Sequence, residues 1–201
     1  MKQTEKTELT VSKIIDAATK EFGEKGYAKG TVNGICKSGI NKGLVYHNFK
    51  DRDEIYLACL RRCCNTFVSL AEESGADTDI LKYMNFRLSF HKEHPCEAHV
   101  LFEAVLQPDR KLQNRISDIL CAFRELNEKV YLTAISSLRL RNGVTEEDAL
   151  EYFRLIQHMF NGYYSKSDNR QMTLDEQIES HESHLPKLFD FLLYGIAEEV
   201  K

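Results

Sequence analysis

The sequence contains few residues that break helices, with three prolines and ten glycines among 201 residues. It also has little of the alternation of β-branched and polar residues that is typical of strands. No apolar run reaches membrane-spanning length, because the longest, FDFLLYGIA (189–197), contains Asp190. The opening residues, MKQTEKTELT, lack the apolar core of a signal peptide. We therefore expect a helical, cytoplasmic protein with no membrane partner.

The cysteines do not form the framework of a small disulfide-rich domain. Six are present and all fall within predicted helices or at their edges: Cys36, Cys59, Cys63, Cys64, Cys96 and Cys121. In a reducing compartment we expect free, partly buried thiols.

The net charge of −4 argues by itself against a nucleic-acid partner, but the charges are unevenly distributed. Residues 1–50 contain nine lysines and five acidic residues, which gives +4 and leaves −8 for the remainder. A basic segment attached to an acidic body is typical of a DNA-binding module joined to another function.

Helical periodicity predicts an all-α protein of about nine helices. A three-helix DNA-binding domain with a helix-turn-helix is expected over residues 1–50. A larger helical domain is expected over residues 51–201. The predicted helices cover residues 10–25, 31–38, 41–49, 51–73, 78–92, 95–106, 109–141, 145–165 and 174–199.

Capping residues mark several of these boundaries. Gly26 follows the first helix, and Asn41 is placed to cap the third. Asp51 with Glu54 resembles a capping box, as does Thr145 with Asp148.

In a helix-turn-helix, the second of the paired helices enters the major groove of DNA. Its N-terminal side chains meet base edges, while flanking groups hold phosphates. Ordinary packing or solvation remains the alternative for each side chain, and Phe49 is expected to anchor the helix inward. The candidate DNA contacts in this part of the chain are Asn41, Lys42, Gly43, Leu44, Tyr46, His47 and Lys50.

Three motifs in this region are IIDAATKEFGEKGY (14–27), TVNGI (31–35) and NKGLVYHNFKDRDEIY (41–56). They resemble the DNA-binding head of the TetR/AcrR family of bacterial transcriptional regulators. The resemblance implies a homodimer that binds a DNA operator and responds to a small molecule, with residues 51–201 as the helical effector-binding and dimerisation domain. It also implies that LFDFLLYGI (188–196) is part of the dimer-forming bundle. Its implied DNA contacts are Thr31, Lys42, Tyr46, His47 and Lys50.

One spacing departs from the family pattern. Ile35 and Gly39 are four residues apart, where the family usually has five. The turn must absorb the missing residue, or the recognition helix must dock differently. An alternative function is therefore a helical sensor or interaction protein with weakened DNA binding.

Aromatic side chains of the predicted body are candidates for an effector pocket. The alternative for each is plain core or dimer interface. The candidate ligand contacts are Phe86, Phe90, Phe102, Tyr131, Phe153 and Tyr163.

Two clusters leave a metal-responsive or redox-responsive regulator as a further alternative. Residues 91–99, HKEHPCEAH, contain three histidines and one cysteine, but their spacing fits no familiar zinc site. Cys59 and Cys63 share a face of one helix and are followed by Cys64. We predict no metal and no cofactor, and we interpret His181 and His184 as surface residues.

The predicted function is thus a ligand-responsive transcriptional regulator, most simply a repressor. It binds a near-palindromic operator as a homodimer and is released by an effector. We predict that the chain is not an enzyme, because no nucleophile–base set or carboxylate pair with clear geometry is present.

Overall fold

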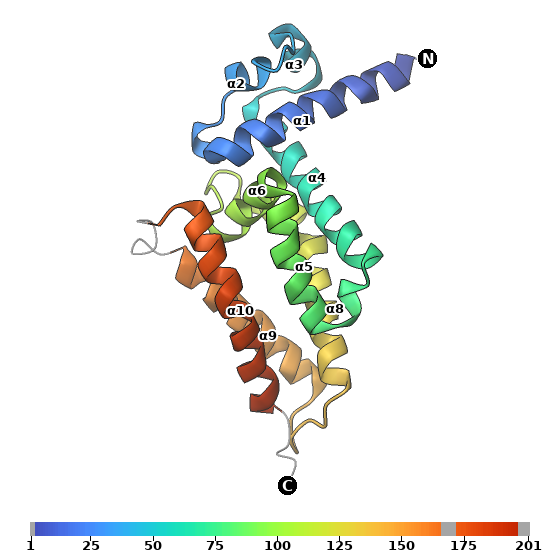
Figure 1. Cartoon of the computed structure of the whole chain (residues 1–201), viewed down its shortest axis with the longest axis vertical. Coiled ribbons are helices and arrows are strands. Elements are labelled where there is room, and N and C mark those ends of the chain that lie inside the picture. The colour runs from blue at the N-terminus through green and yellow to red at the C-terminus, as the bar shows by residue number, and fades with distance from the viewer. Residues whose placement is uncertain (1–2, 166–171, 197–201) are drawn as a thin grey trace. The chain divides into compact units, whose positions relative to one another are not determined.

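Ten α-helices and one short 3-10 helix form the computed structural model, which describes residues 3–165 and 172–196 (Figure 1). No β-strand occurs among these residues, so the predicted all-α class is confirmed. The helices are α1 Gln3–Lys29, α2 Val32–Cys36, α3 Lys42–Asn48, α4 Arg52–Glu73, η1 Ala76–Thr78, α5 Ile80–Glu93, α6 Pro95–Leu106, α7 Gln113–Ile119, α8 Cys121–Ser136, α9 Glu146–Tyr164 and α10 Leu174–Ile196. None of these helices is both long and apolar enough to cross a membrane.

The contacts divide the chain into two units. The first comprises the chain up to Asn65 together with Glu93–Leu120, and so contains α1–α3, most of α4, α6 and α7. The second comprises Thr66–Lys92 and the chain from Cys121 onwards, with α5, α8, α9 and α10.

One predicted helix is wrong. Residues 109–141 do not form a single helix, because α7 ends at Ile119, α8 begins at Cys121, and α8 itself ends at Ser136. Leu120 between them is buried, with φ −76° and ψ 3°. Asp109 also does not start the helix: its carboxylate accepts the Lys111 N–H at 2.9 Å in a turn before α7. No glycine or proline marks these breaks, so the periodicity did not reveal them.

The predicted caps are present. Thr145 and Asp148 form a reciprocal capping box at the start of α9. The Asp51 carboxylate accepts the Glu54 N–H at 2.9 Å and so caps the first turn of α4. Gly26 interrupts the helical geometry near the end of α1 with φ 74°. Glycine adopts this positive φ readily because it has no Cβ atom.

In the first unit, α1 packs through one apolar face. Ile14, Ala18 and Phe22 are fully buried, and the Phe22 ring meets the edge of Tyr56 from α4 at 5.3 Å between centroids. Helix α6 is joined to the end of α1 by polar contacts. Both Glu103 carboxylate oxygens accept the Tyr27 N–H at 3.0 Å, and His99 Nδ1 donates to the Gly23 carbonyl at 2.8 Å.

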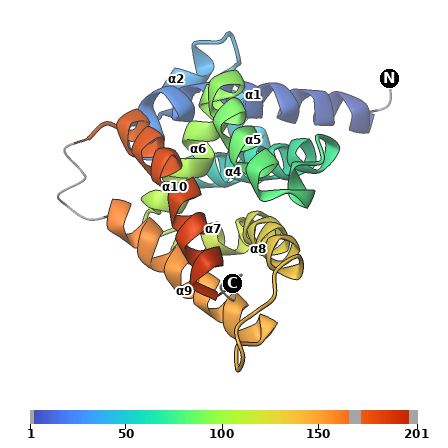
Figure 2. The same cartoon turned by 60° about the horizontal axis from the view of Figure 1, so that its bottom comes forward.

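In the second unit, α8 and α10 both pack on α9, as Figure 2 shows. Tyr131 of α8 stacks on Phe153 of α9 with 4.4 Å between centroids, and Phe189 of α10 completes this cluster. A second cluster surrounds Phe67, with Phe86 and Phe90 of α5 at 5.0 and 4.9 Å.

Candidate DNA-binding head

The head is defined here as α1–α3 with the residues up to Lys50. Figure 1 shows α2 and α3 together on one side of α1. All eight predicted DNA contacts are exposed, including Leu44 at 41% and Tyr46 at 49%. Val45 and Phe49 instead face the interior, at 0% and 8% exposure. The apolar side of α3 thus holds the helix on the head and leaves its other side open.

Two of the predicted contacts already serve as helix caps. The Thr31 hydroxyl accepts the Gly34 N–H at 2.9 Å and so caps α2. The side-chain oxygen Oδ1 of Asn41 accepts the Gly43 N–H at 2.8 Å and caps α3. Their side chains satisfy helix N-termini that would otherwise lack partners.

The turn between α2 and α3 accommodates the short spacing from Ile35 to Gly39. The N–H groups of Ser38 and Gly39 donate to the carbonyls of Ile35 and Cys36 at 3.3 and 3.1 Å, which tightens the end of α2. Gly39 then reverses the chain with φ 90°, a conformation that other residues rarely adopt. Across the turn, Lys42 Nζ donates to the side-chain oxygen of Asn33 at 3.0 Å.

The buried carboxylate of Glu21 joins α1 to the start of α2, a role that the sequence pattern did not predict. Glu21 is 6% exposed and accepts the Thr31 N–H at 3.1 Å and the Lys25 ammonium at 2.6 Å. Burial raises the pKa of Glu21, but the hydrogen bonds from Lys25 and Thr31 outweigh it, so the pKa lies below its ordinary value. The backbone of Gly34 lies directly against this carboxylate, where a Cβ atom would overlap its oxygens.

We therefore expect Gly34→Ala to destabilise the head. Helix propensity alone favours alanine over glycine by about 1 kcal/mol in a helix interior. Here the added methyl group displaces the Glu21 carboxylate and leaves the Thr31 N–H without its partner, a loss of about 1–3 kcal/mol. Urea unfolding measures the difference.

Gly162→Ala on α9 is the matched control, because a Cβ there meets no atom within 4 Å. That variant should be stabilised by up to about 1 kcal/mol. Equal stabilisation of both variants would show that the Glu21 contact contributes nothing.

The predicted ligand residues do not form one group. Tyr131 and Phe153 belong to one aromatic cluster of the second unit, while Phe86 and Phe90 belong to the other. Tyr163 is 56% exposed, and Phe102 lies fully buried in the first unit. The Tyr131 hydroxyl is buried and has no hydrogen-bond partner among the described residues, and burial raises its pKa to about 12.

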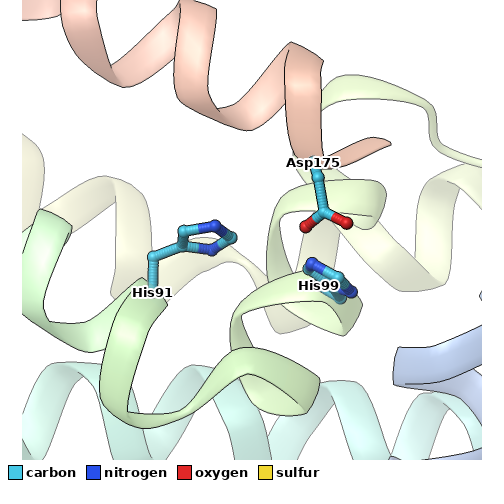
Figure 3. A group of neighbouring side chains, drawn as sticks. All are labelled: His91, His99 and Asp175. Atoms are coloured by element: carbon cyan, nitrogen blue, oxygen red, sulfur yellow. The ribbon is translucent and has the colours of Figure 1, made fainter. Parts of the chain in front are cut away.

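The histidines of residues 91–99 belong to different units. His91 lies in the last turn of α5 in the second unit, whereas His94, Cys96 and His99 lie in the first. Figure 3 shows His91 on α5, His99 on α6, and Asp175 at the start of α10. Cys96 packs against Gly23, where a Cβ atom would lie 2.6 Å from the Cys96 Cα atom. We draw no metal site from this segment.

The cysteines of α4 are free but inaccessible. Cys59, Cys63 and Cys64 have 0% exposure. Burial raises the pKa of Cys59 to about 12, and it raises the pKa of Cys63 well above its ordinary value. Because the thiolate is the reactive species, these thiols are poorly suited to redox sensing.

A buried ion pair crosses the second unit, and it overturns the interpretation of His181 as a surface residue. Arg87 of α5 donates to both carboxylate oxygens of Glu182 of α10, at 2.7 and 2.6 Å. His181 is 3% exposed, with Nδ1 donating to Glu182 at 2.9 Å and Nε2 lying 3.0 Å from the Asn161 side chain. His184 is exposed, as expected.

Comparison with known proteins extends the resemblance. Residues 14–59 match the family model for "Bacterial regulatory proteins, tetR family". The negative transcriptional regulator IcaR of the biofilm operon icaADBC, from Staphylococcus epidermidis, is 40% identical over 57 residues, which are 28% of this chain and 31% of IcaR. The HTH-type transcriptional repressor Rv1474c of Mycobacterium tuberculosis is 32% identical over 63 residues, which are 31% of this chain and 34% of the repressor. The chain thus matches about a third of the length of each.

The fold is shared beyond the head as well. The transcriptional regulator FadR of Bacillus subtilis, in complex with stearoyl-CoA, aligns over 92% of this chain and 98% of its own, with a TM-score of 0.60 and 20% identity. The family and these relatives are regulators rather than enzymes, in agreement with the prediction for this chain. The head of the chain is thus similar to that of the bacterial regulatory proteins of the tetR family, over residues 14–59.

Proposed function

We propose that the chain is a transcriptional repressor that binds a near-palindromic operator as a homodimer and is released by a small-molecule effector. Residues 1–50 are its DNA-binding domain, and residues 51–201 carry effector binding and dimerisation. Such a regulator acts in the cytoplasm, beside the chromosome. The observation that carries the proposal is the exposure of all eight predicted contacts on a basic head of the TetR type.

The exposed side chains of the head support a division of roles. Tyr46 and His47 lie on the open side of α3, where they reach base edges or phosphates. Lys42 and Lys50 stand at the two ends of α3 and are suited to phosphates. Thr31 and Asn41, whose oxygens cap helices, contribute through the backbone N–H groups that they orient.

An apolar stripe on the second unit supports the homodimer. Along α9, four residues at helical spacing are 53–64% exposed: Tyr152, Leu155, Met159 and Tyr163. On the neighbouring α10, Phe191 and Tyr194 are 64% and 72% exposed. Exposed apolar side chains that gather on adjacent helices mark an interaction surface, and a second copy of the same face would cover it with two-fold symmetry.

The effector is proposed to have a large apolar part. The two aromatic clusters of the second unit provide apolar surface, and the buried Tyr131 hydroxyl could hydrogen-bond a polar group of the ligand. FadR, which shares the fold, was crystallised with stearoyl-CoA. An acyl chain is therefore a reasonable first ligand to test.

Lys42→Ala and Tyr46→Ala should each weaken binding to the operator by at least ~10-fold, because each removes one charge-assisted or polar contact to DNA. Lys42→Ala should also reduce the slope of log affinity against log salt by about 1. Fluorescence anisotropy with a duplex from the chain's own upstream region measures both effects. Lys111→Ala, an exposed lysine outside the head, is the control and should leave binding unchanged.

The short helices of the head support one second candidate. Helix α2 has five residues and α3 has seven, so a sensor with weakened DNA binding is the alternative. In that case neither Lys42→Ala nor Tyr46→Ala would change the anisotropy, and binding would match that of a random duplex.

A further inference from the structure

A pocket of about 260 Å³ lies in the first unit, between α4 and α7. From α4 it is lined by Glu54, Leu57, Ala58 and Arg61, whose spacing places them on one face of the helix. From α7 it is lined by Arg115, Asp118 and Ile119, again on one face. None of the aromatic residues predicted to bind an effector lines this pocket.

The inner part of the pocket is apolar and its rim is charged. Leu57 and Ile119 are 4% and 7% exposed, so they form a buried apolar surface. Arg61, Arg115 and Asp118 are exposed at the rim, and Glu54 is half-buried. An apolar interior with a few convergent polar groups is the usual composition of a small-molecule site.

The two rim arginines are not used to hold the fold. Within the described part of the chain, the guanidinium groups of Arg61 and Arg115 form no hydrogen bond and no ion pair. The other arginines of α4 differ: Arg62 pairs with Asp16 at 2.6 Å, and Arg52 donates to the Tyr27 carbonyl at 2.6 Å. Two unpaired guanidinium groups beside one pocket favour a ligand with a carboxylate, which arginine binds in a bidentate manner.

The acidic side chains at the same rim require a positive group on the ligand as well. The Asp118 carboxylate likewise has no hydrogen bond or ion pair with a described residue. The Glu54 carboxylate accepts the Lys50 N–H at 2.6 Å through Oε2, which fixes its position while it keeps its negative charge. A simple anion would be repelled by these two carboxylates, and a simple cation by the two arginines.

We propose that this pocket binds a free α-amino acid with an apolar side chain, such as leucine. Its carboxylate pairs with Arg61 and Arg115, its ammonium group with Asp118 and Glu54, and its side chain contacts Leu57 and Ile119. The pocket volume of about 260 Å³ leaves room for a ligand of this size. The site does not depend on the proposed operator binding.

Isothermal titration of the full chain, without DNA, tests the proposal. Leucine, valine and phenylalanine are titrated beside isocaproate, which lacks the ammonium group, and isoamylamine, which lacks the carboxylate. The expected result is saturable binding of at least one of the amino acids, with both analogues at least ~10-fold weaker because each loses charge-assisted hydrogen bonds. Arg61→Gln, Arg115→Gln and Asp118→Asn should each weaken amino-acid binding at least ~10-fold.

Arg110→Gln is the matched control, since Arg110 is an exposed arginine outside the pocket. Thermal unfolding of each variant checks that the fold is kept, as expected for exposed side chains. The proposal is overturned if no amino acid binds, if isocaproate or isoamylamine binds as tightly as the amino acid, or if Arg110→Gln weakens binding as much as the pocket variants.

Discussion

Glu182→Ala is expected to lower the free energy of unfolding by about 3–5 kcal/mol, because it leaves the Arg87 charge buried without its partner. Arg87 and Glu182 are 3% and 4% exposed and joined by two hydrogen bonds, so solvent does not screen the pair. Urea unfolding followed by circular dichroism measures the change.

Glu128→Ala is the control for this variant. Glu128 binds Arg154 in the same two-bond geometry, at 2.8 and 2.7 Å, but the arginine side chain is 57% exposed. Exposed pairs contribute about 0–1 kcal/mol, so the control should change little. Equal losses in the two variants would contradict a special role for burial.

The pH dependence of stability tests the Arg87–Glu182 ion pair in a second way. Burial raises the pKa of Glu182, but the Arg87 charge and its hydrogen bonds lower it to about 2, below the ordinary 4.5. A carboxylate with a depressed pKa in the folded state stabilises the protein above its ordinary pKa and loses this contribution as the pH falls. The wild type should therefore lose stability between pH 4.5 and about 2, and Glu182→Ala should lose less over that interval.

The variant Leu155→Glu/Met159→Glu is expected to be a monomer. The two side chains are 53% and 64% exposed in the middle of the apolar stripe of α9, and two carboxylates there would be buried without partners in a dimer. Operator affinity should then fall by about 100-fold or more, because the two heads no longer bind as one molecule. Sedimentation velocity measures the mass, and anisotropy measures the affinity.

Leu81→Glu is the control for the dimer variant, because Leu81 is an apolar residue with 69% exposure on α5, a helix that is not part of the stripe. It should leave both the mass and the affinity unchanged. A monomeric wild type at micromolar concentration, or a double variant that remains dimeric, would contradict dimerisation through α9.

The sequence predicted the parts of the fold that local signals determine. Asn41, Thr145 and Asp51 cap helices because their side-chain oxygens meet N–H groups only two or three residues away. Phe49 is buried as expected from its place in the head motif. The break at Leu120 carries no such local signal, so it was missed.

The buried polar side chains that the sequence did not predict have their partners outside their own helical turn. His181 stands among polar neighbours in ESHESHLP, yet it is buried beside Glu182, whose partner Arg87 lies 95 residues away. Glu21 belongs to a run rich in charged residues, and it is buried by Thr31 and the backbone of Gly34. The aromatic content likewise indicated a core but did not determine which side chains share a cluster.

Operator binding by the wild-type chain tests the central claim most directly. In fluorescence anisotropy, a duplex from the upstream region is titrated with the chain at several salt concentrations, beside a random duplex of equal length. We predict saturable binding of two chains per duplex, tighter than to the random duplex, with an affinity that falls steeply with salt. Equal binding to both duplexes, unaffected by Lys42→Ala and Tyr46→Ala, would contradict a specific DNA-binding role for this head.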